Sequence, residues 1–208
     1  MTTIKYVLAL FAIVAFSVAA TPAAMAGDSG VDTPAAKFVQ KMGDNALASL
    51  TGKDISAAER EKRVRNLLKA NFDIPTIGRF ALGTYWKDAS DAQKKEYLSL
   101  FEDMIVKTYT QRFAEYSGQA LKVAGSLSRN EKDSIVSSQI IQKDGPPVSV
   151  DWVVRNKGGM KVIDVMVEGI SMSVTQRSDF ASVIQSGDGT VATLITSLRD
   201  RKMAAAKP

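Results

Sequence analysis

Three carboxylates lie close together in the second half of the chain, and a pair of carboxylates can serve as general acid and general base. They are Asp151, Asp164 and Glu168. Each sits in a run where polar and apolar residues alternate, and acidic residues are common on the solvated side of an antiparallel sheet. Because nothing else near them has a catalytic character, we interpret them as part of a solvated sheet face. A catalytic pair remains the alternative.

Ser171 and Ser173, together with Lys161, raise a second possibility, because a serine beside a lysine can act as a nucleophile. In the sequence, however, the two serines alternate with Ile170 and Met172. That spacing is what the polar side of a strand would show. We therefore favour a structural role for both serines.

The composition removes most other catalytic chemistry. The 208 residues include no Cys and no His, which excludes thiol catalysis, disulfides and thiolate metal sites and makes Ser-His-Asp catalysis and zinc or non-haem iron sites untenable. No loop carries regularly spaced acidic ligands for Ca²⁺. The sequence thus predicts no catalytic residue, no metal and no cofactor.

Large apolar side chains are abundant and are the third feature with functional meaning. They are Phe72, Ile77, Phe80, Leu82, Tyr85, Trp86, Phe101, Met104, Ile105, Tyr109, Trp152, Met160, Met166 and Met172. They fit either a filled core or the lining of an apolar cavity, for which adaptable Met side chains are suited. Periodicity does not separate these two readings.

Helical periodicity in the first half and strand periodicity in the second half define the elements that position these residues. Helices are predicted from Pro34 to Gly52, from Ser56 to Asp73, from Pro75 to Gly83 and from Ser90 to Tyr116. Strands are predicted at 121–129, 134–143, 147–156, 160–168 and 170–177, with Gly169 as a corner between the last two runs. Helical spacing returns from Phe180 and again from Val191.

This order predicts an α+β fold. The N-terminal and C-terminal helices are expected to pack on one face of a curved antiparallel sheet and to enclose an apolar cavity.

The N-terminus has the features of a secretory signal peptide. Lys5 precedes an apolar run, and Ala24-Met25-Ala26 is a small-x-small cleavage site. We predict a cleaved signal over 1–26, a flexible lead-in over 27–33, one domain over 34–200 and a flexible tail over 201–208. Cleavage would leave 26 basic and 22 acidic residues, a net charge of +4. That balance, without basic clusters interleaved with aromatics, argues against a nucleic-acid partner.

The chain resembles the MlaC / toluene-tolerance family of periplasmic phospholipid-binding proteins. Four segments carry the resemblance. They are Phe72-Asp73-Ile74-Pro75 with Leu82-Gly83 and Trp86, then Gln93 with Leu100-Phe101, Tyr109 and Tyr116-Ser117-Gly118, then Pro147-Val148-Ser149-Val150-Asp151-Trp152, then Asp164-Val165 with Glu168-Gly169 and Ser171, followed by Arg177 and Phe180. Met160 stands where many relatives carry Trp. The resemblance covers most of residues 34–200.

The resemblance implies a soluble, non-enzymatic periplasmic carrier that takes part in outer-membrane lipid asymmetry. Its expected cargo is phospholipid. Its expected partners are an inner-membrane ABC transporter complex with a membrane-anchored lipid-binding ring and an outer-membrane lipoprotein/porin complex. A branch of the family is associated with hopanoids, so a hopanoid-associated carrier is an alternative within the family.

The apolar faces of the predicted elements supply the candidate lipid-binding residues. From the helices these are Phe80, Leu82, Trp86, Phe101, Ile105 and Tyr109, and from the sheet Val150, Trp152, Val154, Ile163, Val165 and Val167. Two readings from other classes remain beside the carrier: an exported α+β enzyme that uses Asp151, Asp164 or Glu168, and an interaction module with a filled core.

Overall fold

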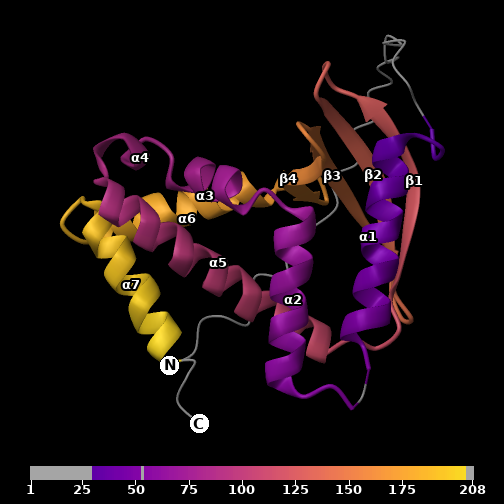
Figure 1. Cartoon of the computed structure of the whole chain (residues 1–208), viewed down its shortest axis with the longest axis horizontal. Coiled ribbons are helices and arrows are strands. Elements are labelled where there is room, and N and C mark those ends of the chain that lie inside the picture. Colours follow the sequence, from indigo (N-terminus) through magenta and orange to yellow (C-terminus); the bar gives the residue numbers. More distant parts are fainter. Residues whose placement is uncertain (1–29, 53, 205–208) are drawn as a thin grey trace.

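The structure is a computed structural model, and it describes residues 30–52 and 54–204. The order of elements is shown in Figure 1. The helices are α1 (Pro34–Leu50), α2 (Ala57–Asn71), α3 (Ile74–Leu82), α4 (Tyr85–Asp88), α5 (Asp91–Ala114), α6 (Met172–Ser186) and α7 (Val191–Ala204). The strands are β1 (Ala120–Ser128), β2 (Asp133–Ile141), β3 (Val148–Asn156), β4 (Met160–Val167) and β5 (Ile170–Ser171). The fold is therefore α+β, as the sequence predicted.

Short polar side chains set the beginnings of several helices. Thr33, Ser56, Asp73 and Ser90 each accept a hydrogen bond from a backbone N–H in the first turn of the helix that follows. Such caps satisfy N–H groups that have no partner inside the helix. At Ser90 the return bond from its own N–H to Gln93 completes a capping box, as expected from the sequence.

The five strands form one antiparallel sheet in the order β1-β2-β3-β4-β5. The turn between β3 and β4 contains Gly158 and Gly159, whose φ values are 70° and 135°, a region that glycine adopts without strain. The pairing of β3 with β4 shifts register so that Val153 faces Asp164 and Val154 faces Val162. Ile163 is thus the extra residue of a bulge.

This bulge corrects one detail of the predicted face of β4. Cross-strand partners share a sheet face, so Val162, Val165 and Val167 lie with Val154, Trp152 and Val150 respectively. A strict period of two had placed Ile163 on the same sheet face as Val165 and Val167. The extra residue shifts the alternation by one position, and this shift is not visible in the spacing of apolar residues.

The prediction of a strand over 170–177 was wrong. Glu168 and Gly169 have positive φ values, 50° and 78°, and form a tight turn that reverses the chain. Only Ile170 and Ser171 then pair with β4, after which α6 begins. The Ser171 hydroxyl caps this helix by accepting from the Val174 N–H. Alternation in this run was therefore overridden by a helix cap.

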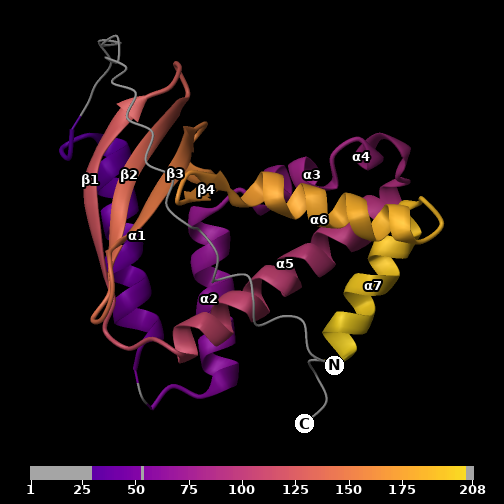
Figure 2. The same cartoon turned by 180° about the vertical axis from the view of Figure 1, so that it is seen from behind.

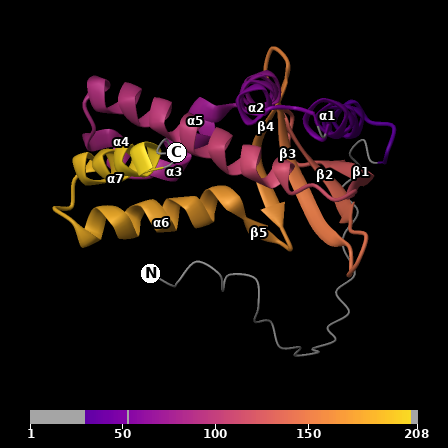
Figure 3. The same cartoon turned by 90° about the horizontal axis from the view of Figure 1, so that it is seen from below.

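Helix α1 covers the sheet, and α1 and α2 lie on the same side of it (Figures 2 and 3). One core forms where α1 meets β2, β3 and β4. Its buried residues are Ala35, Ala36, Val39, Met42, Val136, Val154 and Val162. Burial of this apolar stripe against the sheet holds the N-terminal helix in place.

Helices α3, α5, α6 and α7 form a second core beside the sheet. Tyr97, Phe101 and Phe180 meet at its centre, with ring centroids 5.8–6.1 Å apart. The Tyr97 hydroxyl donates to the Gly78 carbonyl at 2.8 Å. Burial raises the pKa of Tyr97, so this hydroxyl stays protonated and keeps donating. A third, smaller core joins α1, α2 and α5.

Two arginines of α2 make contacts within the chain. Arg63 binds Glu59 and the Ser49 carbonyl, and Arg65 binds Glu102 and Asp103 of α5. The carboxylate of Asp103 also binds Lys202 of α7. These cations therefore tie α2 to the end of α1 and to α5.

The ends of the described chain are attached to the domain. Gly30 pairs with Ser126 of β1, and the hydroxyl of Thr33 is hydrogen-bonded to that of Ser126. At the other end, α7 continues to Ala204, whereas the sequence placed the end of the domain at 200. The predicted signal peptide, the residues of the lead-in before Gly30 and the end of the tail lie outside the described residues.

Asp133→Asn is expected to lower the free energy of unfolding by about 1–3 kcal/mol at neutral pH. The buried Asp133 carboxylate accepts two bonds from Arg155, at 2.7 and 2.8 Å, and these bonds hold the pKa of Asp133 below its ordinary value. The contribution should be present above about pH 4 and should fade as the pH falls toward the lowered pKa. Urea unfolding of both proteins at several pH values measures this. A difference that grows with acidification would contradict it.

Candidate functional site

A pocket of about 460 Å³ lies between α1, α2, the end of α5 and the sheet. It is lined by Met42, Gly43, Ala46, Leu47, Val64, Leu67, Leu68, Phe72, Tyr109, Arg112, Phe113, Glu115, Tyr116, Gln119, Ala120, Leu121, Ile140, Trp152 and Val165. Most of these side chains are apolar. The volume falls in the range of about 300–1,000 Å³ that is usual for ligand sites.

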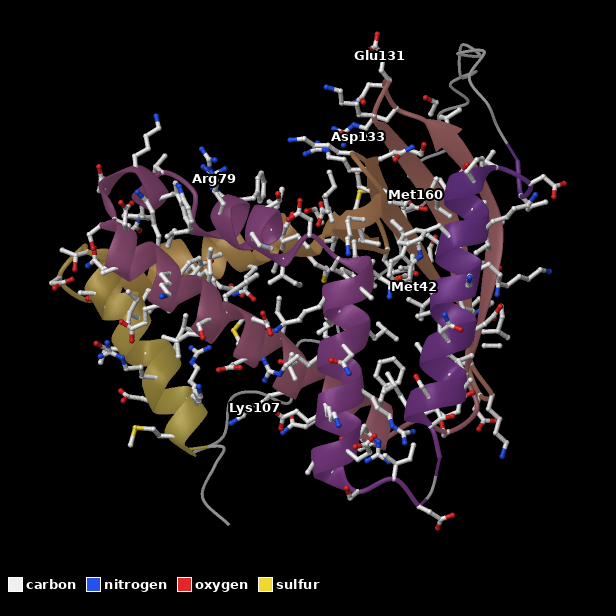
Figure 4. The ribbon with its side chains drawn as sticks, in the orientation of Figure 1. Met42, Arg79, Lys107, Glu131, Asp133 and Met160 are labelled. Atoms are coloured by element: carbon white, nitrogen blue, oxygen red, sulfur yellow. The ribbon has the colours of Figure 1, made fainter. Side chains whose placement is uncertain are left out.

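The pocket exists because the apolar stripes of α1 and α2 face one another and the sheet without filling the space between them. Figure 4 shows Met42 of α1 lying between the two helices. Gly43 and Ala46 continue the α1 wall with little side-chain volume. Phe72, in the extended link after α2, contacts all three cores and closes one side. Its strand-like bridge to Val162 fixes that link against β4.

Three of the sequence-predicted residues line the pocket: Tyr109, Trp152 and Val165. They come from α5, β3 and β4. The Trp152 indole N–H donates to the Ser138 hydroxyl at 2.9 Å, and that hydroxyl donates to the Val150 carbonyl. This relay fixes the orientation of the indole against the sheet and satisfies its one polar atom.

The other predicted residues lie elsewhere. Leu82 and Phe101 are buried in the helical core, and Trp86 and Ile105 pack against it. Phe80 is on the surface of α3 with the Arg177 guanidinium 5.6 Å above its ring. In the sheet, Val150 and Val154 are buried, while Ile163 and Val167 are half-buried and do not line the pocket.

Sequence reasoning missed the walls that α1 and α2 provide. These are Met42, Ala46, Leu47, Val64, Leu67, Leu68 and Phe72. The apolar stripes of both helices are visible in the sequence, but their spacing indicates surfaces that pack against other elements and does not indicate a pocket wall. Gly43 gives no signal of unfilled space, because the Leu121 side chain of β1 lies where a side chain at position 43 would be.

Two of the three carboxylates that suggested catalysis serve the fold. Asp164 accepts from the Ser171 hydroxyl and from the Ser173 N–H, and so connects β4 to the first turn of α6. Glu168 accepts from the Ser149 N–H at the end of the sheet. None of Asp151, Asp164 and Glu168 lines the pocket.

Lys161 is also structural. Its ammonium donates to the carbonyls of Lys69 and Ala70 at the end of α2, where helix carbonyls lack partners within the helix. It does not contact Ser171 or Ser173. The geometry therefore does not favour the enzyme reading.

Polar groups enter the pocket from one segment. Tyr109, Arg112, Glu115, Tyr116 and Gln119 all belong to the end of α5 or to the loop after it. The Arg112 guanidinium lies 5.9 Å from the centre of the Tyr109 ring. Tyr109 is 38% exposed, so its side chain lies where the pocket meets solvent. The pocket thus has apolar walls and one polar side.

Within residues 30–52 and 54–204, no group of three or more acidic residues is arranged to hold a metal ion. In the same part of the chain, no helix has the length and apolar character needed to cross a membrane.

The fold and the pocket together define a class: α+β proteins that hold an apolar or amphipathic molecule between helices and a sheet. Within that class, the chain belongs to the MlaC protein family, whose sequence model matches residues 40–200. This family consists of lipid-binding transport proteins and is not known for enzymatic activity.

Two known proteins are similar to this chain. The intermembrane phospholipid transport system binding protein MlaC of Haemophilus influenzae is 27% identical over 141 residues, which are 65% of this chain and 65% of that protein. The match therefore spans slightly less than two thirds of that relative's length. A phospholipid-binding protein from Ralstonia solanacearum, solved in complex with a phospholipid, has a TM-score of 0.71 and 25% identity, covering 82% of this chain and 98% of its own.

Proposed function

We propose that this chain is a soluble periplasmic carrier that moves phospholipid between the outer membrane and an inner-membrane ABC transporter complex. The observation that carries the proposal is the apolar pocket between α1, α2, α5 and the sheet, in a fold shared with a protein that was solved holding a phospholipid. Each CH₂ group moved from water into such a pocket gains about 0.8 kcal/mol, so acyl tails supply the driving force for binding.

The carrier does no chemistry on its cargo. The three carboxylates first considered for catalysis lie outside the pocket, and an unreactive lining lets the lipid leave unchanged. The proposed partners are the membrane-anchored lipid-binding ring of the transporter and an outer-membrane lipoprotein/porin complex. A hopanoid cargo is the alternative within the family, and a rigid ring system would need the same apolar walls.

The periplasmic location is proposed from the signal-like segment over 1–26. It agrees with the intermembrane transport system to which the Haemophilus influenzae relative belongs by name. An exported chain without Cys needs no disulfide and suits that compartment.

Native mass spectrometry of protein purified without detergent tests the proposal. We expect a bound species whose extra mass equals that of phospholipid, and lipid extraction should identify it. Extra mass that corresponds to a hopanoid would select the alternative. Empty protein that also fails to take up lipid from added vesicles would contradict both.

A further inference from the structure

The polar side of the pocket carries one cation and one anion next to each other. Arg112 lies in the last turn of α5, and Glu115 is the residue that caps the end of this helix. Both line the pocket and both are exposed, so they mark where the pocket meets solvent. Side chains three residues apart on a helix are neighbours, with about 5–6 Å between their Cβ atoms.

Arg112 is available to an incoming anion. Among the described residues it forms no ion pair with a carboxylate, and its guanidinium lies over the Tyr109 ring. A guanidinium matches two phosphate oxygens with two parallel N–H donors. The carbonyl groups at the end of α5 disfavour an anion at this position. Arg112 is therefore the group that permits a phosphate here.

Glu115 adds a requirement that a phosphate alone does not satisfy. Glu115 lines the same side of the pocket three residues after Arg112, and it has no ion-pair partner among the described residues. It would repel a headgroup that carries only negative charge. A headgroup with a primary ammonium a few bonds from the phosphate would place that ammonium on Glu115 and donate N–H hydrogen bonds to it.

From this juxtaposition we propose that Arg112 and Glu115 form a headgroup site that selects zwitterionic aminophospholipids. Arg112 binds the phosphate and Glu115 binds the ammonium. The inference rests on the proposed lipid-carrier function and adds a preference of the carrier for one class of lipid headgroup. A quaternary ammonium fits less well because it has no N–H donor, and the Tyr109 ring that could accept it lies beside Arg112. Selectivity arises from attraction for one headgroup and repulsion of the other.

Competition between two lipids with identical acyl chains tests the site. Delipidated protein is incubated with vesicles that contain equal amounts of phosphatidylethanolamine and phosphatidylglycerol, and the bound lipids are counted by native mass spectrometry. Wild-type protein should carry about two- to five-fold more phosphatidylethanolamine, the range expected for a solvent-exposed ion pair. Glu115→Lys should abolish or reverse this preference, and Glu115→Gln should give an intermediate ratio. Arg112→Gln should lower the loading of both lipids.

Glu131→Lys is the matched control, since it makes the same change of charge on an exposed residue. Glu131 lies at the β1–β2 hairpin, at the opposite end of the sheet from the end of α5 (Figure 4). Its lipid ratio should equal that of the wild type. Circular dichroism of each variant checks that the fold is kept, which is expected because both side chains are exposed.

Equal loading of both lipids in wild-type protein and in Glu115→Lys would overturn the headgroup site and leave the carrier function intact. A change in the Glu131→Lys ratio as large as that of Glu115→Lys would also overturn it, because net charge would then explain both. Absence of any bound lipid in the wild type would instead contradict the carrier function itself.

Discussion

Trp152→Glu is expected to reduce the amount of phospholipid that the protein carries by about tenfold or more, because a carboxylate without a partner in an apolar pocket is costly. The indole forms part of the sheet wall of the pocket, and its N–H is held by Ser138. The substitution removes apolar contact area and also places a charge where acyl tails would lie. Extraction and quantification of bound lipid per protein chain measures the effect.

Leu127→Glu provides the matched control for this experiment. Leu127 lies on β1 of the same sheet, is 47% exposed and does not line the pocket. The same type of substitution there should leave lipid loading close to that of the wild type. Unchanged loading in a folded Trp152→Glu protein would show that the lipid does not reach the sheet wall.

Phe101→Ala is expected to lower the free energy of unfolding by about 3–5 kcal/mol, the usual cost of removing a large buried ring. Phe101 is 1% exposed and contacts the rings of Tyr97 and Phe180. The substitution leaves a cavity in the core of α3, α5, α6 and α7, away from the pocket. Urea unfolding measures the loss, and lipid loading of the remaining folded protein should change little.

Phe80→Ala is the comparison for Phe101→Ala. Both residues were first considered for lipid binding, but Phe80 lies on the surface and Phe101 lies in the core. Phe80 is 43% exposed, and its loss should cost no more than about 1 kcal/mol. Equal destabilisation by both substitutions would contradict the placement of Phe101 at the centre of the helical core. A large drop in loading with Phe101→Ala at full stability would instead place this ring in the cargo site.

The charged and polar residues show how far residue type alone can be interpreted. Asp164 was considered as one of a carboxylate pair and Ser171 as a nucleophile beside Lys161, and the lack of other catalytic groups nearby argued against both uses. In the structure, Ser171 donates to Asp164 at 2.6 Å and also caps α6. Capping by this hydroxyl lets a helix begin at Met172, although the alternation of residues 170–175 predicts a strand. Ser171 can cap a helix only because the turn at Glu168 and Gly169 reverses the chain just before it. The periodicity of apolar residues does not reveal this turn.

The sequence by itself determined the α+β class, most helix beginnings and the apolar stripes of α1, α2 and β3, because caps and periodicity are local properties. The types of residue available argued against catalysis, and the resemblance to the MlaC family supplied the lipid-binding hypothesis. Only the tertiary structure decided which apolar residues line the pocket. Phe101 and Trp152 have equally apolar surroundings in the sequence, but Phe101 is enclosed by three other helices, whereas Trp152 faces the space that α1 and α2 leave open. Whether an apolar stripe fills a core or lines a cavity depends on the distance between elements that are far apart in the chain. The periodicity of apolar residues in the sequence does not contain that distance.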